Sequence, residues 1–329
     1  MRFSPFVLLN LLFVLFLYPS LSQLQLQEAN EAFSKVYALK PNAYLFAAGI
    51  VKFYLNDVYS AGQIFARNAQ LYETRFGSVA SEERIWRDAC YLKLYNSLPR
   101  RDRENNVSFY DIPKIPPFEG DVIDNNEDQF DNSIKLEKRK IQRLARDLFD
   151  ASVLNDQPRI IISRAKLRAI AGDSSKKYGI LDPKQWKLTS WIYLGLHYDV
   201  MGQLDQSKEC MKNAVLLSSV AGASQDLFRH LPMIHMSQRD WFDDEEIDHV
   251  GDNDNSRTDL KYSVDDTKVL QADIQQEILN SIQKMTIADI KVYLERKGIM
   301  VNGKKTELQA KMFSRLITDA LNLSNELEH

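Results

Sequence analysis

Apolar residues recur at three- and four-residue steps through most of this 329-residue chain. Ala61, Ile64, Phe65 and Ala69 are one such set. This spacing places apolar side chains along one face of an α-helix. Because only 12 Gly and 10 Pro are present to make turns, the sequence predicts long helices instead of many short strands. The expected fold class is all-α.

The composition changes along the chain and predicts its division into segments. We expect a leader at 1–22, a helical domain at 23–241, an acidic linker at 242–267 and a locally basic helical module at 268–329. Within the helical domain, the stretch at about 99–132 is rich in Pro, Asp and Asn and is expected to be an exposed loop. The helical pattern after this loop is interrupted at Pro158.

The N-terminus has the features of a secretory signal peptide. Arg2 precedes an apolar run from Phe6 to Leu17, and small residues precede a cleavage point before Gln23. The alternative is an uncleaved anchor, but the run is shorter than the roughly 20 residues that a spanning helix needs, so cleavage and no stable membrane span afterwards are expected. Acceptor sequons at Asn106 and Asn322 fit a glycoprotein of the endoplasmic reticulum lumen or a secreted one. A complex plastid or another organelle is the alternative location.

The net charge of −3 gives no general signal for nucleic acid or membrane, so any such signal must be local. The two cysteines, Cys90 and Cys210, lie among apolar neighbours at helical spacing. We expect two buried thiols. A single disulfide between them in an oxidising compartment is the alternative.

A helix–turn–helix pattern of about 34 residues begins near Trp191. Its members are Trp191, Leu194, Gly195, Tyr198, Gly202, Ser207, Met211 and Ala214. A weaker copy near Leu45 keeps Gly49, Ala61 and Phe65. Small residues at these positions let paired helices approach closely. The pattern resembles the tetratricopeptide repeat (TPR).

The blocks Phe76–Arg87, Leu194–Leu196 and Arg239–Trp241 also resemble an uncharacterised family of repeat proteins from algae and plants. That resemblance implies no activity. TPR-like proteins usually bind a protein or peptide on the face formed by the first helix of each pair. The resemblance therefore implies a partner-binding face made of Phe46, Phe53, Thr189, Ile192, Leu196 and Asp199. The alternative is that neighbouring helices cover these residues.

The C-terminal region predicts two short helices joined by a basic turn. Thr286 with Asp289 is expected to cap the first helix, and Thr306 the second. Ile287, Ile290 and Leu294 would form the apolar face of the first helix, and Leu308, Met312 and Leu316 the inner face of the second. The pattern resembles a SAP module, a helix–loop–helix that generally binds DNA or RNA backbone.

That resemblance, with the preference of phosphates for helix N-termini, implies a phosphate-binding set. Its members are Lys297, Gly303, Lys304, Lys305, Thr306, Lys311 and Arg315. The alternative is a solvated basic surface.

No catalytic signature is present in the sequence. His230 and His235 are not spaced to share a helical face, and we expect structural or surface roles for both. We expect no enzyme activity, no cofactor and no metal site. The sequence thus favours a non-enzymatic interaction scaffold of the secretory pathway that binds a protein partner. The alternative is an organellar nucleic-acid-binding adaptor that acts through the SAP-like module.

Overall fold

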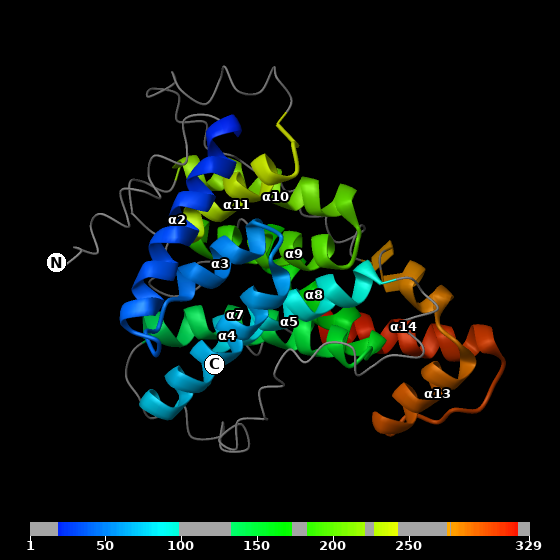
Figure 1. The fold of residues 1–329 in the computed structure, drawn as a ribbon. Coiled ribbons are helices and arrows are strands. Elements are labelled where there is room, and N and C mark those ends of the chain that lie inside the picture. Colours follow the sequence, from blue (N-terminus) through cyan, green and yellow to red (C-terminus); the bar gives the residue numbers. More distant parts are fainter. Residues whose placement is uncertain are drawn as a thin grey trace. The chain divides into compact units, whose positions relative to one another are not determined.

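The structure, a computed structural model, describes residues 19–98, 133–172, 183–220, 227–242, 275–276 and 278–321. Every regular element in these ranges is a helix, which confirms the all-α fold of stacked helices (Figure 1). The chain divides into two compact units, Met1–Ser133 with Trp191–Asn255, and Ile134–Ser190 with Ser256–His329.

The first unit joins helices from distant parts of the sequence. Its helices are α2 (Pro19–Leu39), α3 (Phe46–Tyr54), α4 (Val58–Phe76), α5 (Ser81–Ser97), the second half of α9 (Pro183–Val200), α10 (Leu204–Val220) and α11 (Leu227–Gln238). α11 packs against α2 and α3 as well as against α10. The last helix of the unit therefore covers its first two helices.

Aromatic rings fill the core where α3, α4 and α5 meet. The ring centroids of Phe53 and Trp86 lie 5.3 Å apart at nearly right angles, and those of Phe65 and Trp86 lie 5.8 Å apart in a stacked arrangement. All three side chains are fully buried. Their mutual contact adds to the hydrophobic stabilisation of the three-helix junction.

One type of backbone turn joins three pairs of consecutive helices. It links α3 to α4 at Asn56, α7 (Ser133–Val153) to α8 (Gln157–Gly172) at Asn155, and α9 to α10 at Gly202. These residues have φ of 62°, 53° and 74°, a region that asparagine and glycine tolerate best. In each turn the following residue donates its N–H to the carbonyl five residues earlier, at 2.8–3.0 Å. The three turns thus define three helical hairpins.

Small residues bring the helices of two of these hairpins close together. A Cβ atom added at Gly49 would lie 2.6 Å from Cζ of Phe65, and one added at Gly195 would lie 2.8 Å from Cε of Met211. Ser207 also donates a 2.8 Å hydrogen bond from Oγ to the carbonyl oxygen of Gly195. The small-residue spacing in the sequence is therefore used for close packing.

The α7–α8 hairpin has the same turn without the small residues. Leu148 and Ile160, both buried, occupy the positions that Gly195 and Ser207 hold around Gly202. This is why the repeat pattern does not reveal the hairpin. The predicted interruption at Pro158 is the start of a new helix. Pro158 lies in the first turn of α8, where its missing N–H costs no helical hydrogen bond.

In the second unit, the C-terminal helix–loop–helix shares one core with α8. α13 (Ile287–Arg296) and α14 (Lys305–Leu321) contact each other, and α14 also packs against α8. The core contains Ile161 and Ala165 of α8 together with Ile278, Ile282, Met285, Ile290, Tyr293, Leu294, Leu308, Met312 and Leu316. Of the six apolar residues expected on the inner faces of these two helices, five are buried together here, whereas Ile287, the first residue of α13, is 44% exposed.

Several expectations concern residues outside the described ranges. These are the apolar run of the leader, the loop at 99–132, the two sequons and most of the acidic linker. The expected cleavage point before Gln23 falls within α2. None of the helices in the described ranges combines the length and the apolar character needed to cross a membrane.

Candidate functional site

The helix that precedes the basic loop, α13, is capped at its start and closed at its end. Thr286 and Asp289 form the expected reciprocal capping box at the start of α13. After α13, the Ile299 N–H donates to the carbonyl of Leu294 at 2.8 Å, and Gly298 has φ of 66°. The helix therefore ends where the sequence predicts.

Four residues of the expected phosphate-binding set, Lys297, Gly303, Lys304 and Lys305, are exposed in or beside this loop. α14 begins at Lys305, so Thr306 lies in its first turn and is not the cap that the sequence suggested. The Lys304 N–H instead donates to Oε2 of Glu307 at 3.2 Å. A carboxylate is thus already present at the helix N-terminus where a phosphate was expected.

Lys311 has a structural role in the same loop. Its Nζ donates to the carbonyl oxygens of Met300 and Asn302 at 3.1 and 3.2 Å. Arg315, one turn further along α14, is exposed. The lysine therefore fixes the loop to α14 while its positive charge stays at the surface.

Four of the six residues of the expected partner-binding face belong to the core. Phe53, Ile192, Leu196 and Asp199 are all buried, and only Phe46 and Thr189 are partly accessible. Neighbouring helices cover this face, which was the alternative reading of the sequence. A partner cannot reach these four side chains in this structure.

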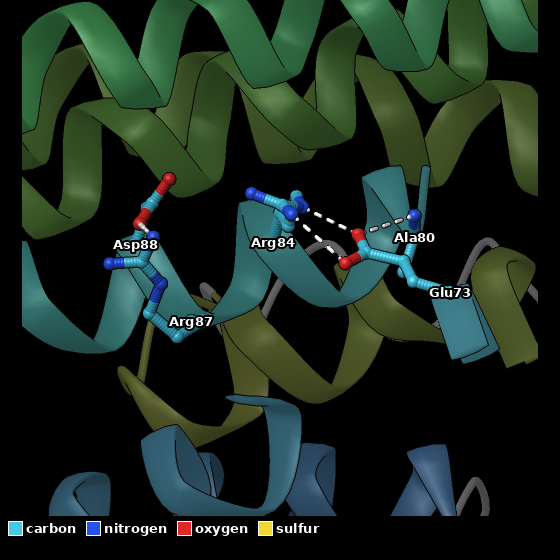
Figure 2. A network of polar contacts seen from close by, with 5 residues as sticks. All are labelled: Glu73, Ala80, Arg84, Arg87 and Asp88. Carbon is cyan, nitrogen blue, oxygen red and sulfur yellow. Dashed lines mark hydrogen bonds and ion pairs between the residues drawn. The ribbon is translucent and has the colours of Figure 1, made fainter. Parts of the chain in front are cut away.

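A buried ion pair fixes the corner between α4 and α5 (Figure 2). Oε1 of Glu73 accepts hydrogen bonds from Nε of Arg84 at 2.6 Å and from the Ala80 N–H at 3.1 Å, while its Oε2 accepts from the second guanidinium nitrogen at 2.9 Å. Both side chains are only 10% exposed. Gly77 ends α4 in the left-handed conformation. A two-point contact of this kind between helices is rigid.

The rigid corner carries exposed aromatic rings. The ring centroids of Tyr72 and Phe76 lie 4.8 Å apart on α4, and Phe76 is 58% exposed. Tyr44, which is 46% exposed, donates its hydroxyl to the buried Glu83 carboxylate of α5. We call Tyr44, Tyr72 and Phe76 the corner aromatics. Local spacing in the sequence gives no sign of this grouping, because only the fold brings residue 44 to the α4–α5 corner.

A second polar cluster is buried inside the first unit. The Tyr54 hydroxyl lies 3.3 Å from Nδ1 of His235, and Nε2 of His235 lies 3.9 Å from Oδ1 of Asp199. Arg239 forms an ion pair with the same Asp199 oxygen at 2.5 Å. Apart from Arg239, these side chains are buried, so the cluster is not open to a substrate.

The environment of this cluster favours neutral His235. Burial lowers the pKa of His235 from 6.5 to about 4, because the charged imidazolium would lose its hydration. Asp199 opposes this shift, while Arg239 and Lys93 reinforce it. Burial also raises the pKa of the Tyr54 hydroxyl. The structural role expected for His235 agrees with this burial.

Within the part of the chain that the structure describes, the remaining reactive side chains form no further site. Cys90 and Cys210 are buried free thiols, and burial raises the pKa of Cys90. In the described ranges, no three His, Cys, Asp or Glu side chains are grouped to hold a metal ion.

Comparison with known proteins adds no relative. No protein-family model, curated protein or solved structure matches the chain. The packed helical hairpins are compatible with a helical repeat protein.

Proposed function

We propose that this protein is a non-enzymatic interaction scaffold of the secretory pathway and that it binds a protein partner through the corner aromatics. The observation that carries the proposal is the exposure of Phe76 and Tyr44 on a corner fixed by the Glu73–Arg84 ion pair. Large aromatic side chains on a rigid support are typical anchors of protein interfaces, since little entropy is lost when they are buried.

The corner replaces the TPR-like face as the expected contact site. That face is covered at four of its six positions, whereas the corner aromatics are accessible without any rearrangement. The proposed TPR relationship is supported by the two closely packed hairpins at Gly49 and Gly195.

Fewer observations support the alternative function, an organellar nucleic-acid-binding adaptor. The SAP-like helix–loop–helix presents exposed lysines, as such an adaptor requires. However, the Glu307 carboxylate already accepts the N–H at the start of α14, so this backbone donor is not available to a phosphate and only the lysine side chains are left to bind one.

The partner site can be tested with the full chain in its native host. A photo-crosslinking amino acid at position 76 should form a defined adduct with a protein partner. Tyr72→Ser combined with Tyr44→Ser should abolish the adduct, whereas Leu39→Ser, at a more exposed apolar residue of α2, should not. An adduct that is unaffected by the paired tyrosine substitutions would refute the proposed site.

The compartment needs a separate measurement. An internally tagged chain that starts at Gln23 and loses mass on glycosidase treatment would support the secretory pathway. A chain that is trimmed further and lacks glycan inside an organelle would overturn this location and favour the nucleic-acid adaptor.

A further inference from the structure

The loop between α13 and α14 exposes a large apolar side chain amid positive charge. Met300 is 73% exposed at the middle of the apolar run Ile299–Val301. Its two neighbours are partly buried and pack against the core of the second unit. Met300 is therefore the one residue of this apolar run whose side chain faces away from the core of the second unit.

This exposure belongs to a fixed loop. Lys311 of α14 donates to the carbonyls of Met300 and Asn302, and the Ile299 N–H closes the end of α13 by donating to Leu294. The loop is thus held at its middle and at its start. Met300 is presented on a rigid support and does not fold back onto the core.

Basic side chains predominate around Met300, although Glu295 and Glu307 flank the loop and the Glu307 carboxylate accepts the Lys304 N–H. From Arg296 to Thr306 the chain carries four basic residues, Arg296, Lys297, Lys304 and Lys305, and no acidic residue. All four are exposed, and the ammonium of Lys311 lies beneath the loop. An exposed apolar side chain surrounded by basic side chains has two features that favour binding to an anionic membrane surface. Its apolar area can be buried among the acyl chains, and the positive charges are attracted to the headgroups.

We propose that this loop is a membrane-contact site, in which Met300 inserts shallowly into an anionic lipid surface while Lys297, Lys304 and Lys305 contact the headgroup phosphates. Nucleic acid fits less well, because backbone phosphates would use the lysines but give no reason to expose Met300. The proposal concerns peripheral contact and is independent of the partner site at the α4–α5 corner.

Vesicle sedimentation of the full chain tests this inference. We expect binding to phosphatidylcholine vesicles with about 30% phosphatidylserine, weakened by salt, and little binding to pure phosphatidylcholine vesicles. Met300→Ser should weaken binding about tenfold, and Lys304→Ala with Lys305→Ala roughly 25-fold. Val292→Ser and Lys291→Ala, at exposed positions of α13, are the matched controls and should change little.

A label provides the second readout. Cys90 and Cys210 are buried, so an environment-sensitive dye can be placed selectively on Met300→Cys. Its emission should shift to the blue on phosphatidylserine vesicles, whereas a dye on Val292→Cys should not shift.

Three outcomes would overturn the proposal. The first is equal binding to both kinds of vesicle at low salt. The second is wild-type binding by Met300→Ser or an unshifted label on bound protein. The third is a protein that duplex DNA displaces from vesicles and that binds this DNA equally well with and without Met300→Ser. This result would assign the loop to nucleic acid.

Discussion

Oγ of Ser207 donates a 2.8 Å hydrogen bond to the carbonyl oxygen of Gly195, twelve residues earlier in the chain. The bond ties α10 to α9 at the point where the missing side chain of Gly195 makes room for Met211. The hairpin at Asn56 repeats the close approach, with Gly49 making room for Phe65, but Ala61 stands in the place of Ser207 and has no hydroxyl to donate. Close approach of paired helices is therefore a recurring device in the first unit.

Gly49 should tolerate no side chain. Gly49→Ala would place Cβ 2.6 Å from the buried Phe65 ring, so we expect the free energy of unfolding to fall by about 1–3 kcal/mol. Gly195→Ala should cost less, since its close contact is the flexible end of Met211. Urea titrations of both variants check this, and an unchanged stability of Gly49→Ala would contradict the packing.

The Glu73–Arg84 pair should be important for stability. Glu73→Ala would leave the buried Arg84 guanidinium without this partner and remove the acceptor of the Ala80 N–H. We expect a loss of about 3 kcal/mol in thermal or chemical unfolding. The more exposed Lys52–Asp57 pair is the control, and Lys52→Ala should cost less than about 1 kcal/mol. Similar costs for both variants would argue against a special role for the corner.

His235 should make stability depend on pH. Because its pKa is about 4 in the folded chain against 6.5 ordinarily, the unfolded chain binds more protons between these values. The contribution of His235 to the free energy of unfolding is therefore fully present above about pH 6.5. It is lost as the pH falls toward 4, which lowers the free energy of unfolding by roughly 3 kcal/mol. Fluorescence-monitored unfolding across this range measures it.

His235→Leu should flatten this pH dependence, because it removes the titrating group while keeping an apolar side chain among Tyr54 and Trp241. His230→Leu, on the same helix but only partly buried, is the matched control. A His235→Leu variant with the same pH profile as the wild type would show that another group is responsible.

The C-terminal helices should depend on α8. Ile161→Ala would remove part of the core shared with Leu308, Met312 and Leu316 and should cost about 2–4 kcal/mol. The same substitution should accelerate hydrogen exchange of the α14 amides. Leu154→Ala, at an exposed position between α7 and α8, should leave that exchange unchanged. If Ile161→Ala also leaves it unchanged, the helix–loop–helix is stable by itself.

The features that the sequence determined by itself are local ones. Helical faces follow from three- and four-residue spacing, and the cap at Thr286 follows from its distance to Asp289. The close hairpins follow from small residues twelve positions apart, such as Gly195 and Ser207. Each of these relations is completed within about one helical hairpin, so the chain's own spacing is sufficient to encode it.

Tertiary structure decided what covers each helical face. An apolar stripe predicts that a helical face is buried but does not identify what buries it. Phe53, Ile192 and Leu196 therefore fitted a partner surface equally well, and the structure shows that they are buried within the protein itself. In the same way, Ile161 joins a core formed by residues more than one hundred positions later. Burial depends on which helices meet in space, and that is settled by the packing of the whole unit instead of by any local spacing.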